Sequence, residues 1–188
     1  EVELAKVDVA EDKLIGGNSY DEINSFSNTR DGGYIIGGTF SSESINLGNG
    51  IVLNGIGSED GMLIKYNAEE EVEWAKVISL SEKDRDTEVV SVSETTDGGY
   101  IVSAIFEYGI ESYRGMIIKY DSKGDVEWQH TIGENNSNTY RGDGISSIIQ
   151  TADGGYILGG YFYSSNMNLG NGIILVNNGK QERNDNKI

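Results

Sequence analysis

Three aspartates occupy the same place in a recurring motif and could bind a cation. Asp31, Asp97 and Asp153 each open the segment Asp-Gly-Gly-Tyr. Carboxylate and carbonyl oxygens are the ligands that Ca²⁺ prefers, and the glycine carbonyls beside these carboxylates are accessible. The same residues also suit a tight turn, because Gly and Asp tolerate positive φ. No D-x-[DN]-x-[DN]-G run is present. We therefore expect a turn role, with Ca²⁺ binding as the alternative and no other cofactor.

Tyrosines outside the repeated positions are the candidate ligand contacts. They stand where the other copies of the repeat have small or polar residues, and they are Tyr108, Tyr113, Tyr140, Tyr161 and Tyr163. A tyrosine offers an apolar ring and a hydroxyl group, which suits contact with a glycan or a protein. Strands also favour tyrosine for packing reasons, so a purely structural role is the alternative.

The remaining reactive side chains predict no catalytic residue. Trp74 and Trp128 each share a strand face with a valine two residues earlier, which favours the core over sugar stacking. His130 is the only histidine, so a histidine metal centre is excluded, and no Gly-x-Ser-x-Gly motif accompanies it. Paired carboxylates for glycoside hydrolysis are available among 31 acidic residues, but the sequence marks no particular pair.

Composition excludes several classes of partner. The 188 residues carry a net charge of −17, which repels a nucleic-acid backbone and an anionic membrane surface. No cysteine is present, so disulfides and thiolate metal sites are excluded. The sequence contains no run of about 18 apolar residues, which is the length needed to span a membrane, so membrane insertion is not predicted.

The Asp-Gly-Gly-Tyr motif joins two predicted strands. Alternating segments at 23–26, 90–93 and 145–148 precede it, and a second alternating segment follows it, as at 34–40. We expect each pair to form a hairpin with a tight primed turn, in which Gly32, Gly98 and Gly154 have positive φ.

Two more strands complete the repeat. Segments 60–66 and 114–120 match one another, as do 71–74 and 125–128. Lys123-Gly124 provides the turn in the second copy, where the first copy has Glu69-Glu70. The repeat is therefore a four-stranded antiparallel unit of the kind found in propeller blades.

The fold class that follows is all-β, with tandem four-stranded antiparallel blades in a β-propeller-like arrangement. We expect one repeat domain over 1–179, with copies at about 1–66, 71–120 and 125–179, and a polar C-terminal tail at 180–188. About three blades are fewer than the roughly four that closed rings need, so the ring is incomplete. Segment 1–7 matches 71–77 and reads as a fourth strand, while polar residues replace the third strand of the last copy.

Two copies contain an insertion with the sequence NLGNGI. It begins at Asn46 in the first copy and at Asn168 in the third. Asn-Gly is a strong primed-turn dipeptide, so each insertion predicts a small extra hairpin.

The repeat resembles a bacterial family of tandem DGGY-type repeats from secreted and cell-surface proteins. The resemblance rests on TTDGGYI at 95–101, KYDSKG at 119–124 and WAK at 74–76. It implies a β-propeller fold and an extracellular or cell-surface location. It implies no activity, because the family has no catalytic motif.

We therefore expect a non-enzymatic, extracellular or cell-surface binding module of β-propeller type, with a glycan or a protein as its ligand. One alternative is a structural, self-assembling subunit that pairs through open blade edges, because unpaired edges are templates for another chain. Self-association is expected in either case. The second alternative is a carbohydrate-active enzyme, which needs two carboxyl groups about 5 to 9 Å apart.

Overall fold

The computed structural model describes residues 14–79, 86–107, 113–132, 143–163, 166–170 and 173–176. These residues form antiparallel sheets and no helix, so the all-β prediction is confirmed. No helix able to cross a bilayer occurs among them. The predicted strand at 1–7 and the predicted tail at 180–188 lie outside the described residues.

Three units repeat along the chain. The first is a sheet in the order β1-β2-β5-β6 and the second a sheet in the order β10-β9-β8-β7, while the described part of the third pairs β11 with β12. Their bounds are β1 (Asp21–Asn28), β2 (Tyr34–Phe40), β5 (Asp60–Tyr66), β6 (Val72–Ile78), β7 (Thr87–Glu94), β8 (Tyr100–Glu107), β9 (Tyr113–Tyr120), β10 (Val126–Ile132), β11 (Gly144–Gln150) and β12 (Tyr156–Tyr161).

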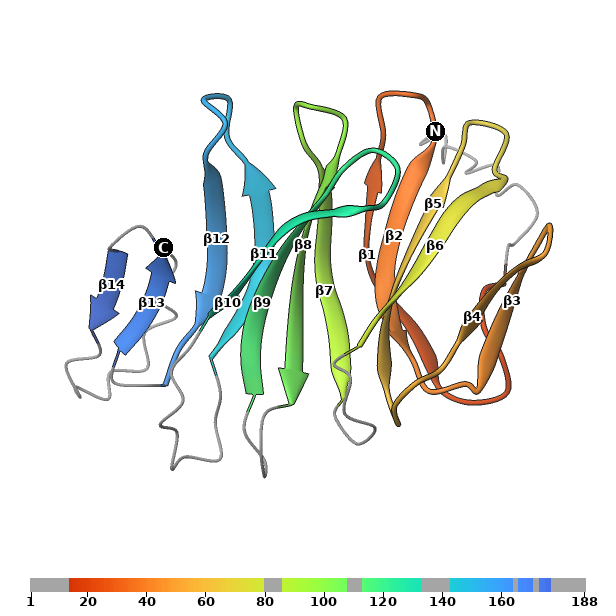
Figure 1. Cartoon of the computed structure of the whole chain (residues 1–188), viewed down its shortest axis with the longest axis horizontal. Helices are drawn as coiled ribbons and strands as arrows, with labels where there is room; N and C mark the ends of the chain where they lie inside the picture. Colours follow the sequence, from red (N-terminus) through yellow and green to blue (C-terminus); the bar gives the residue numbers. More distant parts are fainter. Residues whose placement is uncertain are drawn as a thin grey trace, which may run out of the picture.

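The units stand side by side in a row, with the first at one end and the third towards the other (Figure 1). Two of them are the predicted four-stranded antiparallel blades. The row does not close into a barrel, so the arrangement is that of an incomplete propeller, as predicted.

The Asp-Gly-Gly-Tyr segments form hairpins, but not with the predicted primed turn. Thr29 O accepts a hydrogen bond from Gly32 N (3.0 Å), and Thr29 N donates to Gly33 O (2.9 Å). This is a three-residue loop, in which a type I turn is followed by a left-handed bulge residue. Positive φ is needed only at the bulge, where Gly32, Gly98 and Gly154 have φ of 88°, 82° and 86°. The glycine prediction is confirmed and the turn type is corrected.

Both insertions form the predicted hairpins, β3 (Ser44–Gly48) with β4 (Ile51–Asn54), and β13 (Asn166–Gly170) with β14 (Ile173–Val176). In the first hairpin Asn49 and Gly50 both have positive φ, as a type I′ turn requires. Ile45 and Leu53 of this hairpin pack on Ile36, Met62 and Ile64. The hairpin thus covers part of the first unit.

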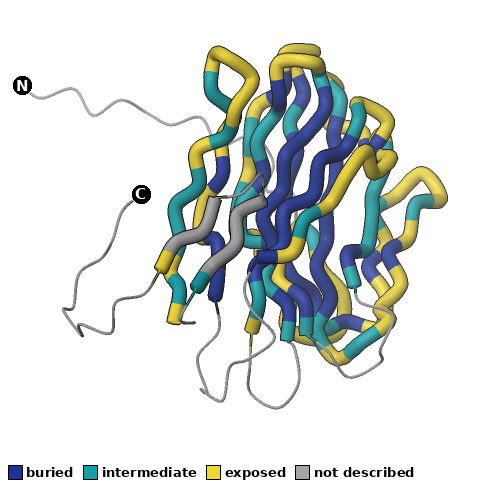
Figure 2. Tube along the Cα trace, turned by 60° about the vertical axis from the view of Figure 1, so that its left-hand side comes forward, coloured by how far each residue is buried: buried dark blue, intermediate teal, exposed yellow. Residues whose placement is uncertain are grey.

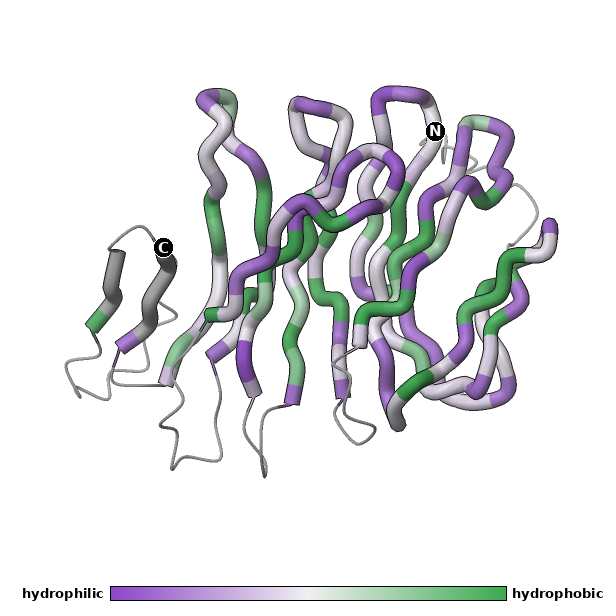
Figure 3. The backbone as a smooth tube through the Cα atoms, in the orientation of Figure 1, coloured by the Kyte–Doolittle hydropathy of each residue, from purple (hydrophilic) through white to green (hydrophobic). Residues whose placement is uncertain are grey.

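The cores lie between units. Ile35 and Leu63 of the first unit pack with Val89, Val92 and Val102 of the second. Ile101 and Ile117 of the second unit pack in the same way with Ile145 and Ile148 of the third. Figure 2 shows the buried residues along the strands, with exposed residues mainly at the turns, and Figure 3 shows hydrophobic residues along the same strands. Each unit is therefore stabilised by its neighbours.

The tryptophans line these interfaces. Trp74 is half-buried against the core between the first two units and meets Tyr100 edge to face, with ring centroids 5.6 Å apart. Trp128 meets Tyr156 in the same way at 5.7 Å, but 40% of it stays exposed. The core prediction therefore holds for Trp74 and only in part for Trp128, on which the third unit packs less completely.

Candidate functional site

The aspartates of the repeated motif are held by their own hairpins. Asp31 accepts hydrogen bonds from the Thr29 hydroxyl, from Gly33 N (3.0 Å) and from Lys65 Nζ (2.8 Å). These contacts, with that of Lys65 the largest, lower the pKa of Asp31 to about 2. The carboxylate is thus committed to the turn and to a lysine, which supports the turn interpretation.

A buried lysine connects each of the first two turns to its sheet. Lys65 Nζ lies 2.8 Å from Asp31, 2.8 Å from Glu73 and 2.7 Å from the carbonyl oxygen of Tyr66, although its side chain is only 1% exposed. Burial alone would lower the pKa of Lys65, but the two carboxylates raise it. We call the set of Asp31, Lys65 and Glu73 the lysine clamp of the first unit.

The second unit repeats the clamp. Lys119 Nζ lies 3.0 Å from Asp97 and 2.8 Å from Glu127. The Thr95 hydroxyl, Gly99 N and Lys119 hold the pKa of Asp97 far below its usual range. In the third unit the Thr151 hydroxyl and Gly155 N lower the pKa of Asp153. The three aspartates lie in separate hairpins, and the described residues contain no group of three acidic, histidine or cysteine side chains placed to hold a metal.

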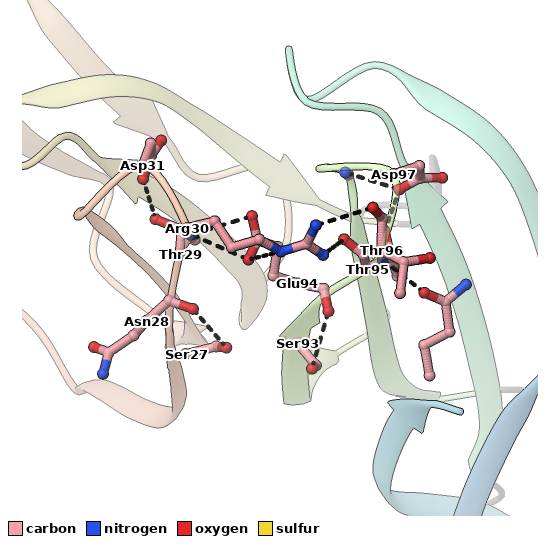
Figure 4. Close-up of polar contacts among 12 residues, drawn as sticks. Ser27, Asn28, Thr29, Arg30, Asp31, Ser93, Glu94, Thr95, Thr96 and Asp97 are labelled. Atoms are coloured by element: carbon pink, nitrogen blue, oxygen red, sulfur yellow. Dashed lines mark hydrogen bonds and ion pairs between the residues drawn. The ribbon is translucent and has the colours of Figure 1, made fainter. Parts of the chain in front are cut away.

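Neighbouring turns are also tied together (Figure 4). The Arg30 guanidinium donates to the carbonyl oxygens of Thr95 (2.6 Å) and Thr96 (3.0 Å), and its Nε lies 3.3 Å from Glu94. An open groove of about 550 Å³ lies between the two turns, lined mainly by polar residues that include Arg30, Asp97 and Tyr100. Its charged side chains already have partners, Arg30 and Glu94 between the units and Asp31, Glu73 and Asp97 in the lysine clamps, so the groove offers little to a ligand.

Three of the five candidate tyrosines lie close together in the structure. Tyr108 and Tyr140 lie outside the described residues. The other three, Tyr113, Tyr161 and Tyr163, gather around Asp143 where the second and third units meet. Asp143 N donates to the carbonyl oxygen of Tyr113 (3.1 Å), and Tyr163 N donates to Asp143 Oδ1 (2.8 Å). We call these three residues the tyrosine cluster.

The cluster combines exposed rings with a buried carboxylate. Tyr113, Tyr161 and Tyr163 are 42–45% exposed, whereas Asp143 is buried. The rings of Tyr161 and Tyr163 meet edge to face, with centroids 6.0 Å apart. Gly144 makes room for Tyr161, because a Cβ there would lie 2.7 Å from its ring. Such a surface can contact an amphipathic ligand through ring faces and hydroxyl groups.

Acidic residues lie near this cluster. Burial raises the pKa of Tyr161, and the nearby Glu88 carboxylate adds to the effect. Burial also raises the pKa of Glu59 and of Glu88, and neighbouring carboxylates add to the effect. The Glu22 carboxylate is one of these neighbours for both residues. We call Glu22, Glu59 and Glu88 the acidic group.

Sequence reasoning missed Asp143 and the acidic group. Asp143 stands at the same place in the repeat as Asp21 and Thr87, just before or at the start of the first strand of each unit. The recurrence of aspartate at this position in two of the three copies could have identified Asp143 from the sequence. The acidic group has no local signal, because its members come from separate strands and loops.

Comparison with protein-family models finds no match, and comparison with curated proteins finds none. Among solved structures, the chain is similar to a protein of unknown function from Bacteroides caccae, with a TM-score of 0.45 and 13% identity over 80% of this chain. The match covers 42% of that protein, so this chain spans less than half of its length.

Proposed function

We propose that this chain is a non-enzymatic, extracellular or cell-surface binding module of β-propeller type, with a glycan as its ligand. The observation that carries the proposal is the tyrosine cluster, in which three half-exposed tyrosines lie beside the buried Asp143. Extracellular location rests on the resemblance to secreted and cell-surface bacterial repeats. A protein ligand remains the competing class.

The cluster suits a sugar for physical reasons. A sugar ring has an apolar face that packs on a tyrosine ring, and its hydroxyl groups can bond to the tyrosine hydroxyls. Tyrosine loses little side-chain entropy on binding. Tyr161 is already fixed over Gly144 and against Tyr163, so part of the ordering cost is met before the ligand arrives.

Charge narrows the ligand class. The chain has a net charge of −17, and Glu88 lies close enough to Tyr161 to raise its pKa. This field repels sulfated glycans and uronic acids. We therefore propose neutral or amino sugars.

A glycan array probed with the full chain tests the proposal, followed by calorimetric titration of the strongest neutral ligand. Tyr161→Ala should weaken binding at least tenfold, which is about 1.4 kcal/mol. Val126→Ala is the control, because Val126 is an exposed side chain of β10 that belongs neither to the tyrosine cluster nor to the acidic group. An array without signal, or equal affinity for Tyr161→Ala and wild type, would contradict glycan binding at this cluster.

The acidic group favours a second candidate, a carbohydrate-active enzyme. Glycoside hydrolysis needs two carboxyl groups close together, and Glu59 lies near enough to Glu88 and Glu22 to interact with both. Release of reducing ends from the bound glycan, lost in Glu88→Gln with binding retained, would support hydrolysis. Binding without any release would leave the non-enzymatic function.

A further inference from the structure

Contacts between successive units use the same positions each time. We call the side of a unit that faces the next unit its forward face, and the opposite side its backward face. On the forward face of the first unit, Gly37 lies beneath Val89, and a Cβ on Gly37 would come within 2.5 Å of that side chain. Ile35 beside it is fully buried. Ile101 of the second unit is fully buried in the same way against Ile145 and Ile148.

Two polar contacts repeat as well. Val92 N donates to Ser25 Oγ (3.1 Å), and one unit later Ile148 N donates to Ser91 Oγ (3.5 Å). At the turns, Arg30 N donates to the Glu94 carboxylate (3.1 Å).

One unit later the turn contact recurs, since Thr96 N donates to Gln150 Oε1 (2.7 Å). The forward face therefore contributes the same groups to each contact between units. They are a buried isoleucine, a small residue two positions later, a serine hydroxyl that accepts a hydrogen bond and a backbone amide that donates one.

The forward face of the third unit carries the same residue types, and no unit covers it within the part of the chain that the structure describes. Ser147, Ile157 and Gly159 stand at the positions of Ser25, Ile35 and Gly37. Ile157 is 52% exposed, whereas its two counterparts are fully buried. Ile149, further along the same strand as Ser147, is also half-exposed.

The backward face of the first unit keeps the complementary residues exposed. Ile23 and Phe26 stand at the positions of the buried pairs Val89–Val92 and Ile145–Ile148. Phe26 is 76% exposed. The β3–β4 hairpin covers Ile36, Met62 and Ile64 on this face but leaves Ile23 and Phe26 of β1 uncovered. Asn28 stands at the position of Glu94 and Gln150. Its side-chain carbonyl oxygen can accept a hydrogen bond from a backbone N–H group, as the side chains of Glu94 and Gln150 do.

We propose that the forward face of the third unit binds β1 of a second copy of this chain, head to tail. Ile23 and Phe26 of the second copy pack on Ile157 and Gly159 of the first copy. Phe26 N donates to Ser147 Oγ, and Ala152 N donates to the side chain of Asn28. The second copy is the occupant because its exposed strand matches, position by position, the strands that the same face binds twice within the chain.

Charge and symmetry agree with this occupant. The residues named for this contact, Ser147, Ile149 and Ile157 on one face and Ile23, Phe26 and Asn28 on the other, are all uncharged. A head-to-tail contact joins different surfaces and can close into a ring. Two copies would bring together roughly six units, which is within the range of closed propellers. The proposal does not depend on glycan binding.

The test uses two full-length variants, Phe26→Asp and Ile157→Asp, each with a charge on one of the two faces. Sedimentation velocity and light scattering should show a wild-type dimer and a monomer for each variant alone. Their equimolar mixture should regain a one-to-one dimer, because it contains one intact pair of faces. Val126→Asp is the control, since Val126 is exposed on β10 and should leave the dimer unchanged. Circular dichroism melts confirm that each variant folds.

Larger wild-type assemblies that either substitution abolishes would support the same head-to-tail contact. A wild type that stays monomeric at every concentration would overturn the proposal. Dimers of Phe26→Asp alone would also overturn it, because they would show that the third unit pairs with itself or that another surface is used.

Discussion

The ammonium group of Lys65 lies 2.8 Å from the carboxylate of Asp31, which joins the turn before β2 to the buried side chain of β5. Lys119 and Asp97 repeat this pair in the second unit. A buried charge is stable only when it is paired and fully hydrogen-bonded, and each lysine has two carboxylates and a carbonyl oxygen around it. The repeated aspartate thus has a structural task in both units.

The lysine clamp predicts a loss of stability when its cation is removed. Lys65→Met keeps most of the packing volume but leaves Asp31 and Glu73 without their shared partner. We expect a loss of about 1 to 3 kcal/mol in the free energy of unfolding, measured by urea denaturation. Lys76→Met is the control, because Lys76 is more exposed and lies 3.7 Å from Asp125. Equal effects of the two substitutions would contradict a special role for the clamp.

Stability should fall at acid pH because of the same aspartates. The folded pKa of Asp31 is lowered to about 2 from an ordinary value near 3.8. A lowered folded pKa contributes stability that is present above the unfolded pKa and is lost as the pH falls towards the folded one. We expect the melting temperature to fall between about pH 4 and pH 2. Asp31→Asn should show a shallower fall over this window, and an identical profile would contradict the assignment.

Between pH 7 and pH 4.5 the acidic group should make the folded state more stable as the pH falls, which is the opposite of the effect of Asp31 at lower pH. The pKa values of Glu59 and Glu88 are raised above their ordinary value of 4.5. Their protonated forms are therefore favoured in the folded state, and stability should rise as the pH is lowered from 7 towards 4.5. Glu88→Gln should reduce this rise in a series of thermal melts. A wild type with no such rise would show that these carboxylates are better solvated than the structure indicates.

These contacts show how far local sequence determines the fold. The hairpins could be predicted because positive φ is a property of single residues, and Gly32, Gly98 and Gly154 supply it directly. The turn type was missed, because a primed turn and a type I turn with a bulge both use an Asp-Gly pair. The extra hairpins were predicted for the same local reason, the Asn-Gly dipeptide.

The contacts between distant segments could not be predicted in the same way. The four-stranded unit could be predicted, but the register of β5 on β2, which pairs Ile35 with Lys65 and brings Lys65 to Asp31, could not. Tyr161 lies near Asp143 because β12 pairs with β11, where Tyr161 is the partner of Gly144. Tyr113 lies on β9 and reaches Asp143 only because the second and third units pack together. The tyrosines could be selected one by one as departures from the repeat, but their grouping required the structure.

Calcium should add little stability to this chain. Asp31 and Asp97 are already bonded to lysine, threonine and glycine groups, so a cation would have to displace these partners. We expect melting temperatures in EDTA and in millimolar CaCl₂ to agree within a few degrees, as weak mass action predicts. A rise of tens of degrees with Ca²⁺ would identify a structural metal site and would reverse the turn interpretation of these carboxylates.

The turn between β5 and β6 predicts a stabilising substitution. Glu70 has a φ of 62°, at the position where the second unit has Gly124 with a φ of 79°. The hydrogen bonds of the two turns correspond, since Glu70 N donates to Asn67 O (3.1 Å) and Gly124 N to Asp121 O (3.1 Å). A residue with a Cβ is strained in this left-handed conformation, whereas glycine is not.

Glu70→Gly should therefore raise the free energy of unfolding by about 0.5 to 1 kcal/mol, measured by urea denaturation. Glu69→Gly is the matched control, because Glu69 lies in the same turn without positive φ and should gain nothing. The reverse change, Gly124→Glu, should destabilise by more than Glu70→Gly stabilises. Besides the backbone strain, a Cβ at Gly124 would lie 3.0 Å from the Trp74 ring and from Lys76 Cε. A neutral Glu70→Gly would mean that contacts of the Glu70 side chain offset the strain of its backbone.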